Sequence, residues 1–103
     1  MTRDDLILMI DQELERVRNL FLRKNRSYGD ENQAFYNFTE TARRKFGTED
    51  LRKAFDVLWI LADKHWTTLG KEGLDDPEAE ERLRDMVVYC LIGIAMLKKF
   101  RSQ

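Results

Sequence analysis

Apolar residues recur every three or four positions along most of the chain, a spacing that places them on one side of an α-helix. Four stretches carry this pattern, and short polar segments containing glycine, aspartate or threonine separate them. In the first stretch the apolar positions are Leu6, Met9 or Ile10, Leu14, Val17 and Phe21. The pattern predicts four helices, over residues 3–25, 31–46, 48–70 and 76–100.

The ends of these helices carry residues that satisfy free backbone groups. Serine, threonine and aspartate side chains accept hydrogen bonds from the first turn, and glycine adopts the left-handed conformation that often follows the last turn. Proline suits the first helical position, where its missing N–H is not needed. The predicted N-caps are Thr2, Asp30, Thr48 and Asp76, with Pro77 at the first position of the fourth helix and Gly47 and Gly70 closing the second and third.

The chain contains no strand-like alternation and no interdomain linker, so residues 1–103 are expected to form a single α-helical domain. Short connections favour antiparallel neighbours, as in a four-helix bundle. After Met86 the fourth helix is apolar on more than one face, which three partner helices hardly enclose. We therefore expect dimerisation to complete the bundle, with Val88, Ile92 or Ala95 at or near the contact.

Composition narrows the class of protein. Hydrophobic residues make up 43% and charged residues 36% of the chain, and the net charge is -1, so nucleic acid is an unlikely partner. The only cysteine, Cys90, excludes an intrachain disulfide and favours a reducing, cytoplasmic location; within its apolar run it is expected to be buried. The longest apolar run has about 12 residues, too short to span a membrane.

Three places carry polar groups that packing alone does not require. In the third helix, Asp63 and Lys64 interrupt an apolar run, either as part of a site or as an exposed face. In the fourth, Glu81, Asp85 and Tyr89 lie about one turn apart, and carboxylates so spaced can share Mg²⁺. The alternative there is a solvated acidic start that complements the helix dipole.

The third place is the corner between the first two helices. Arg23, Lys24 and Arg26 are donors suited to phosphate, Tyr28 offers a ring for stacking, and Gly29 permits close backbone approach. The alternative is a helix C-terminus decorated with cations. His65, with no second histidine or cysteine nearby in sequence, is expected to be a core residue.

In their order along the chain, these motifs resemble a family. The sequence is similar to small phage and bacterial proteins related to MazG, of the all-α nucleoside triphosphate pyrophosphohydrolase group, and to a neighbouring family of unknown function associated with phage nucleotide modification. The matching residues are Lys24, Tyr28, Gly29 and Asp30, then Asn37 and Phe38, then Asp63 and Lys64, then Asp85 and Tyr89.

The resemblance implies an oligomeric helical bundle that binds a nucleotide with Mg²⁺ between helices and hydrolyses a phosphoanhydride. It implies nucleotide contacts by Lys24, Tyr28, Gly29, Asn37, Lys64 and Tyr89, catalytic roles for Asp63 and Asp85, and a metal-ligand set of Asp63, Glu81 and Asp85. Catalytic members carry E-x-x-E on one helix and E-x-x-D on a later one. Here Arg82 stands three residues before Asp85, and the first helix lacks E-x-x-E.

Two functions therefore compete. One is Mg²⁺-dependent nucleotide binding or pyrophosphohydrolysis with an incomplete ligand set, and the other is a non-catalytic helical interaction protein of phage-like origin. The first predicts that Asp63 and Asp85, at similar depths from the loop between the last two helices, point into one polar pocket. Lys64, Tyr28 and Asn37 are expected at its rim.

Overall fold

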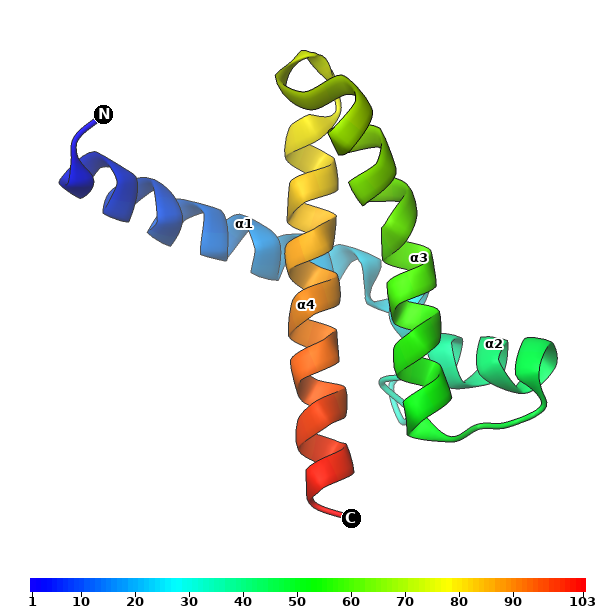
Figure 1. Cartoon of the computed structure of the whole chain (residues 1–103). Helices are drawn as coiled ribbons and strands as arrows, with labels where there is room; N and C mark the ends of the chain where they lie inside the picture. The colour runs from blue at the N-terminus through cyan, green and yellow to red at the C-terminus, as the bar shows by residue number, and fades with distance from the viewer.

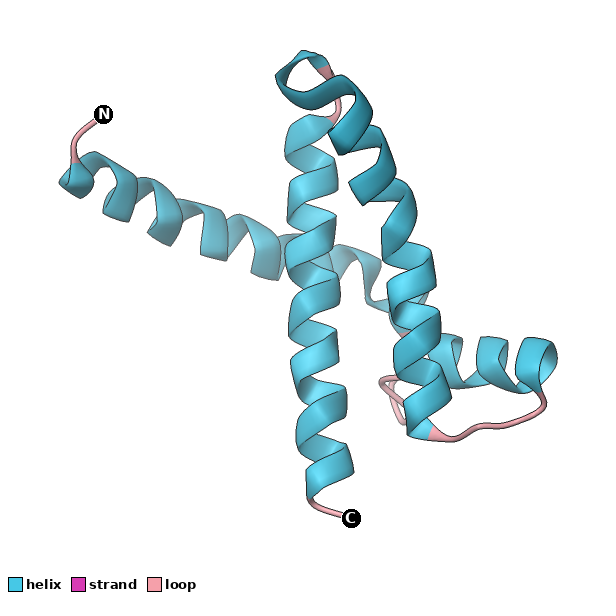
Figure 2. Ribbon diagram, viewed as in Figure 1, coloured by secondary structure: helices cyan, strands magenta, loops and turns pink.

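All of the regular secondary structure in the described residues is helical. A computed structural model describes the backbone of residues 1–103 and every side chain except those of Arg26 and Ser27. The helices are α1 (Arg3–Tyr28), α2 (Tyr36–Phe46), α3 (Leu51–Glu72), the short 3₁₀ helix η1 (Gly73–Asp75) and α4 (Ala79–Arg101) (Figure 2). The predicted all-α class and the four principal helices are confirmed.

The helices pack as a bundle in which α1 and α2 lie across the pair formed by α3 and α4 (Figure 1). α3 and α4 run side by side and antiparallel, joined through η1, as the short connection predicted (Figure 1). α2 packs near the start of α3, whereas α1 passes across α4 and its N-terminal half projects beyond the other helices. None of the helices, over the residues described, has the length and apolar character needed to cross a membrane.

The core lies where the four helices meet. Leucine, valine, phenylalanine and alanine at helical spacing lose nearly all their accessible surface there, which is the main source of stability for a small domain. α1 contributes to this core only through its C-terminal half. The buried apolar cluster comprises Val17, Leu20, Tyr28, Phe38, Ala42, Ala54, Val57, Leu58, Val88, Ile92 and Met96.

The corner after α1 differs from the prediction. α1 continues to Tyr28 instead of ending at Asn25, because the Tyr28 ring packs in the core. Thr2 is its N-cap as predicted, in a reciprocal capping box with Asp5. Asp30 does not cap α2, since its carboxylate accepts hydrogen bonds from the backbone N–H groups of Asn32 and Gln33 and stabilises a turn. α2 therefore begins at Tyr36 and not at Glu31.

The ends of α3 and the start of α4 are also displaced by a few residues. Asp50, not Thr48, is the N-cap of α3, because its carboxylate accepts from the N–H of Arg52. The helix continues past Gly70 and ends before Gly73, whose φ of 59° is left-handed. α4 begins at Ala79, and Asp76 caps the preceding turn by accepting from the N–H of Glu78.

Two expectations about α4 are wrong in their details. Val88 and Ile92 are buried against the chain's own helices, so they are not available to a second copy, whereas Ala95, the third residue named, is exposed. Cys90, expected inside, is exposed. The buried and exposed faces of α4 are the reverse of those expected. α4 packs its Val88–Ile92–Met96 stripe against α3, which leaves the opposite stripe uncovered.

Candidate functional site

A charged pocket of about 340 Å³ lies between α1 and α4. α1 supplies three cations at helical spacing, and α4 supplies one cation and two carboxylates. Such a lining is suited to an anionic ligand that also carries a cation. The lining residues are Arg16, Asn19, Leu20, Arg23, Lys24, Glu81, Arg84 and Asp85.

Asp85 is the centre of the inner wall of this pocket. Its carboxylate lies 3.6 Å from Lys24 Nζ on one side and 3.7 Å from His65 Nε2 on the other. Its Oδ1 atom is buried yet accepts no hydrogen bond from any described side chain, and the same holds for His65 Nδ1. Buried polar atoms that accept no hydrogen bond are unusual in native proteins. Asp85 Oδ1, which is the atom paired with Lys24 at 3.6 Å, therefore keeps unused acceptor capacity at the pocket wall.

Three neighbours of Asp85, which are His65, Tyr28 and Tyr89, have pKa values shifted toward their uncharged forms. Burial lowers the pKa of His65, and the nearby Asp85 carboxylate opposes this only in part. Burial, together with the charge of Asp85, raises the pKa of Tyr28 to about 12 and also raises that of Tyr89. A neutral imidazole and two neutral phenols thus form the apolar side of Asp85, and Lys24 forms its charged side.

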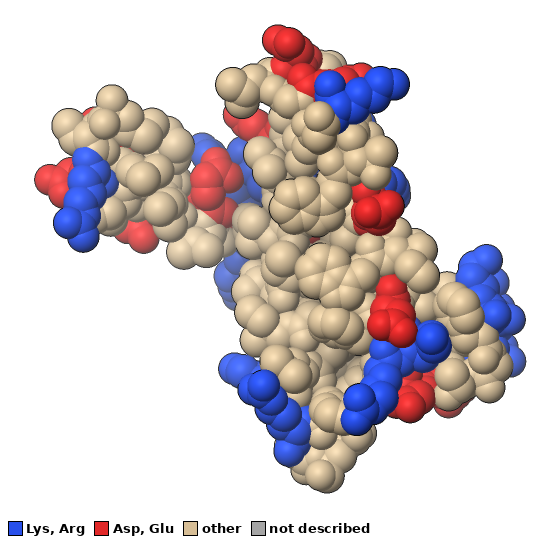
Figure 3. Space-filling view, in the orientation of Figure 1, with Lys and Arg blue, Asp and Glu red and all other residues tan. Residues whose placement is uncertain are grey.

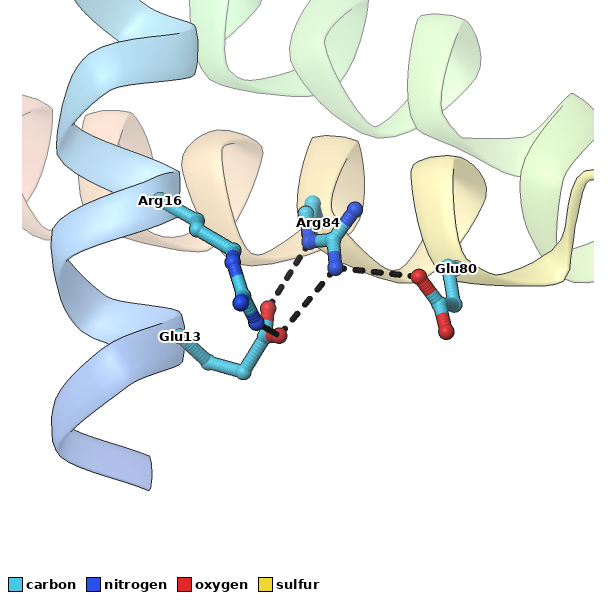
Figure 4. Close-up of polar contacts among 4 residues, drawn as sticks. All are labelled: Glu13, Arg16, Glu80 and Arg84. Carbon is cyan, nitrogen blue, oxygen red and sulfur yellow. Dashed lines mark hydrogen bonds and ion pairs between the residues drawn. The ribbon is translucent and has the colours of Figure 1, made fainter. Parts of the chain in front are cut away.

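A network of ion pairs includes two residues of the pocket lining, Arg16 and Arg84 (Figure 4). Arg84 donates to both carboxylate oxygens of Glu13, at 2.8 and 3.1 Å, and to Glu80 at 3.0 Å. Arg16 also donates to Glu13, and these two guanidinium groups lower the pKa of Glu13 to about 2. The network joins α1 to α4 and engages two of the four cations.

The other two cations are less engaged. Among the described side chains, Arg23 has no carboxylate within ion-pair distance, and Lys24 is 48% exposed with only the 3.6 Å pair to Asp85. Arg26, the third donor expected at this corner, has its side chain outside the described residues. Arg23 and Lys24 are therefore the donors best placed to receive a phosphate.

Asp63 and Asp85 do not share a pocket. Asp63 and Lys64 are both exposed on α3, and neither lines the pocket beside Asp85. His65 takes the facing position instead, and a residue two places away on a helix points about 200° around the axis. The expectation that Asp63 meets Asp85 is wrong because it depended on depth along the helix and not on rotation about it.

The remaining expected nucleotide contacts lie mostly in the core. Tyr28 is buried, with Phe21 stacked on it at 5.7 Å and Tyr89 edge-on at 5.9 Å, so its ring is not open for stacking on a base. Gly29 is required by the chain's own backbone, since an added Cβ would lie 2.1 Å from the carbonyl oxygen of Ala34. Asn37 is half-buried at the start of α2 and lies outside this pocket.

Arg82, at the position where catalytic members of the resembled group carry glutamate, has a clear structural partner. Its guanidinium donates to the buried carboxylate of Asp76 at 2.8 Å and also pairs with Glu78 at 3.2 Å. The side chain therefore holds the turn before α4 and is not directed to a metal.

The carboxylates do not gather into a metal cage. Across the described part of the chain, no three histidine, cysteine, aspartate or glutamate side chains are grouped closely enough to hold a metal ion. Of the three expected metal ligands, Glu81 and Asp85 line the pocket and Asp63 does not. This pair suits an ion such as Mg²⁺, which is usually bound by one or two carboxylates and takes its other ligands from water and phosphate oxygens.

Sequence reasoning missed Arg16, Arg84 and the role of His65. A signal was present in α1, where Arg16, Leu20 and Arg23 or Lys24 recur at three- and four-residue spacing and so share one face. No comparable signal places Arg84 or His65, because their partners come from other helices. Comparisons with protein-family models, curated proteins and solved structures find no match to this chain.

Proposed function

We propose that the pocket between α1 and α4 binds the phosphate groups of a nucleotide, or of a related phosphorylated small molecule, together with Mg²⁺. The observation that carries the proposal is the position of Arg23 and Lys24 at the mouth of a pocket whose inner wall is Asp85. Arginine and lysine are the donors of choice for phosphate, and these two are not saturated by carboxylates of the described residues.

The carboxylates support the Mg²⁺ part of the proposal. Asp85 has a buried Oδ1 atom without a hydrogen-bond donor, and Glu81 lies one turn earlier on the same helix at the same pocket. Bound Mg²⁺ would neutralise phosphate charge. Lys24 would exchange its 3.6 Å contact with Asp85 for a phosphate oxygen, and His65 would keep Asp85 in place from behind.

The resemblance to the MazG-related group adds nucleoside triphosphate pyrophosphohydrolysis to the proposal. Asp85 is the only one of the two expected catalytic carboxylates that lies at the pocket, and Asp63 would have no part in the reaction. Pyrophosphate is the product by which this activity is measured. Binding and cleavage are separate parts of the proposal, because the charged pocket supports binding directly.

The test is a calorimetric titration of the whole chain with nucleoside triphosphates, with and without Mg²⁺. The release of pyrophosphate is measured under the same conditions. Arg23→Ala and Lys24→Ala should each weaken binding by at least tenfold, since a hydrogen bond to a charged group contributes about 1.5–3 kcal/mol. Asp85→Asn should remove the Mg²⁺ dependence. Arg18→Ala is the matched control, because it removes the same charge from α1 without altering the pocket lining. Equal affinities for all four variants and the wild-type chain would refute the site.

A second function is favoured by a different observation. Large apolar side chains are exposed along α1, α3 and α4, among them Ile60 at 60% and Trp66 at 54%. Exposed apolar surface on this scale marks interaction surfaces. A non-catalytic interaction protein would show no nucleotide-dependent change in melting temperature and would still bury this surface against a partner.

A further inference from the structure

The first half of α1 leaves its apolar side chains uncovered by the rest of the chain. We call residues 3–14 the arm; its residues 3–12 are all exposed, and it projects past the other helices (Figure 1). Its apolar side chains are between 44% and 60% exposed. They are Leu6, Ile7, Leu8, Met9, Ile10 and Leu14.

The arm carries the same apolar stripe that α1 uses inside the core. Ile7, Ile10, Leu14, Val17 and Phe21 alternate three- and four-residue steps, the spacing by which one helix packs along another. Val17 is buried, and Phe21 stacks on Tyr28. The stripe therefore continues from a covered section into a section that the chain itself does not cover. An isolated helical stretch of this length is marginal in water, so the arm needs a partner.

α4 presents a matching stripe that faces away from its own core. Leu83, Val87, Cys90, Ile94 and Leu97 alternate four- and three-residue steps, and the apolar members are 40% to 51% exposed. Figure 3 shows a broad surface with few charged side chains over α3 and α4, with charges at its margins. Leucine, valine, isoleucine and cysteine form this stripe, at the spacing of helices that pair side by side.

Charge is complementary between these two surfaces. The arm carries four carboxylates, Asp4, Asp5, Asp11 and Glu13, of which Glu13 is already paired with Arg84 of the same chain, and one cation, Arg3. The end of α4 carries Lys98, Lys99 and Arg101 and no carboxylate. An acidic arm laid along α4 toward its C-terminal end would pair opposite charges at the edge of an apolar seam.

The size of the uncovered surface indicates what covers it. The chain exposes 7947 Å². A folded monomer of its mass is expected to expose about 6,100 Å². Two copies that each bury the difference would share roughly 3,700 Å², which lies in the range of obligate homodimers. The radius of gyration, 15.5 Å, likewise exceeds the value of about 13 Å for a compact domain of this length.

We infer that a second copy of this chain covers these surfaces, with the arm of each copy lying along the exposed stripe of α4 in the other. The exchange is reciprocal, so both stripes are covered in one closed dimer. The inference is independent of the proposed nucleotide site, because the arm and the stripe can pair whether or not the pocket holds a ligand.

Sedimentation velocity at tens of micromolar tests the inference. The wild-type chain should sediment with twice the 12.3 kDa mass of one copy. Ile10→Glu with Leu14→Glu should raise the dimer dissociation constant at least a hundredfold, and Ile94→Glu, in the middle of the α4 stripe, should act in the same direction. Glutamate is a good helix former, so these exposed positions keep their helix. Leu74→Glu is the matched control, because Leu74 is fully exposed in η1 and belongs to neither surface.

The native cysteine gives a second readout that does not depend on mass. Cys90 lies in the middle of the α4 stripe, so a thiol reagent should modify it slowly in the wild-type chain and in Leu74→Glu. Modification should be at least tenfold faster in the Ile10→Glu, Leu14→Glu variant. A wild-type chain that is monomeric overturns the inference. So does a monomer that binds phospholipid vesicles, because the exposed apolar surfaces would then be covered by lipid. A dimer that survives the arm substitutions but not Ile94→Glu overturns the role of the arm.

Discussion

Position 29 requires glycine because the chain's own backbone lies very close to it, and not because of an unusual backbone angle. Its φ of -168° is extended, but a Cβ there would meet the Ala34 carbonyl at 2.1 Å. Gly29→Ala should therefore lower the free energy of unfolding by about 2–3 kcal/mol, as overpacking does. Gly70→Ala is the control, because its Cβ would meet nothing and alanine favours the helix by up to about 1 kcal/mol. Denaturant unfolding of both variants measures the difference, and equal losses would contradict the packing argument.

Tyr28 links burial to pH dependence. Its folded pKa of about 12 lies above the ordinary value of 10.0, so the folded chain keeps a proton that the unfolded chain loses between these values. The stabilisation is complete below pH 10 and is lost as the pH rises toward 12. In a spectroscopic titration, Tyr28→Phe should remove the tyrosinate signal that appears last. Tyr36→Phe, at a side chain 43% exposed, should leave that late signal in place.

At the scale of the element, periodicity predicted which segments are helical but not where each one ends. The spacing of apolar residues is enough to predict that a segment is helical, because it shows whether the segment's own side chains can form one buried face. Ends depend on single hydrogen bonds. Asp30 bonds to Asn32 and Gln33 and so delays α2, and Gly73, not Gly70, takes the left-handed conformation. Several residues could serve equally well as caps, and tertiary packing selects among them.

Asp76 shows how much one such end contributes. Its side chain is 2% exposed, accepts from the N–H of Glu78 and pairs with Arg82. Asp76→Asn keeps an acceptor but removes the charge opposite Arg82, so the free energy of unfolding should fall by about 2–3 kcal/mol. Asp75→Asn makes the same change at the exposed neighbour and should be nearly silent. Urea unfolding followed by circular dichroism compares the two, and similar losses would remove the buried pair as the cause.

At the scale of the molecule, the site was predictable only in part. Lys24 and Asp85 were identified from sequence and do lie together, although they come from helices far apart in the chain. Asp63 was assigned to the same pocket because it lies at the right distance from the loop. A helix turns about 100° per residue, so an assignment that is two residues out reverses the face. His65 faces Asp85 for this reason, and only the packing of α3 on α4 determines it.

The extended shape leads to a prediction about stability as a whole. If each arm is ordered by a second copy, unfolding releases two chains, and the melting temperature must rise with protein concentration. A tenfold increase corresponds to about 1.4 kcal/mol. For a dimer of this size that should raise the melting temperature by roughly 3–5 °C. The Ile10→Glu, Leu14→Glu variant should melt at a lower temperature that does not change with concentration, whereas Leu74→Glu should behave as the wild-type chain. Calorimetry over a hundredfold range of concentration would detect this dependence, and a constant wild-type melting temperature would mean that one copy folds alone.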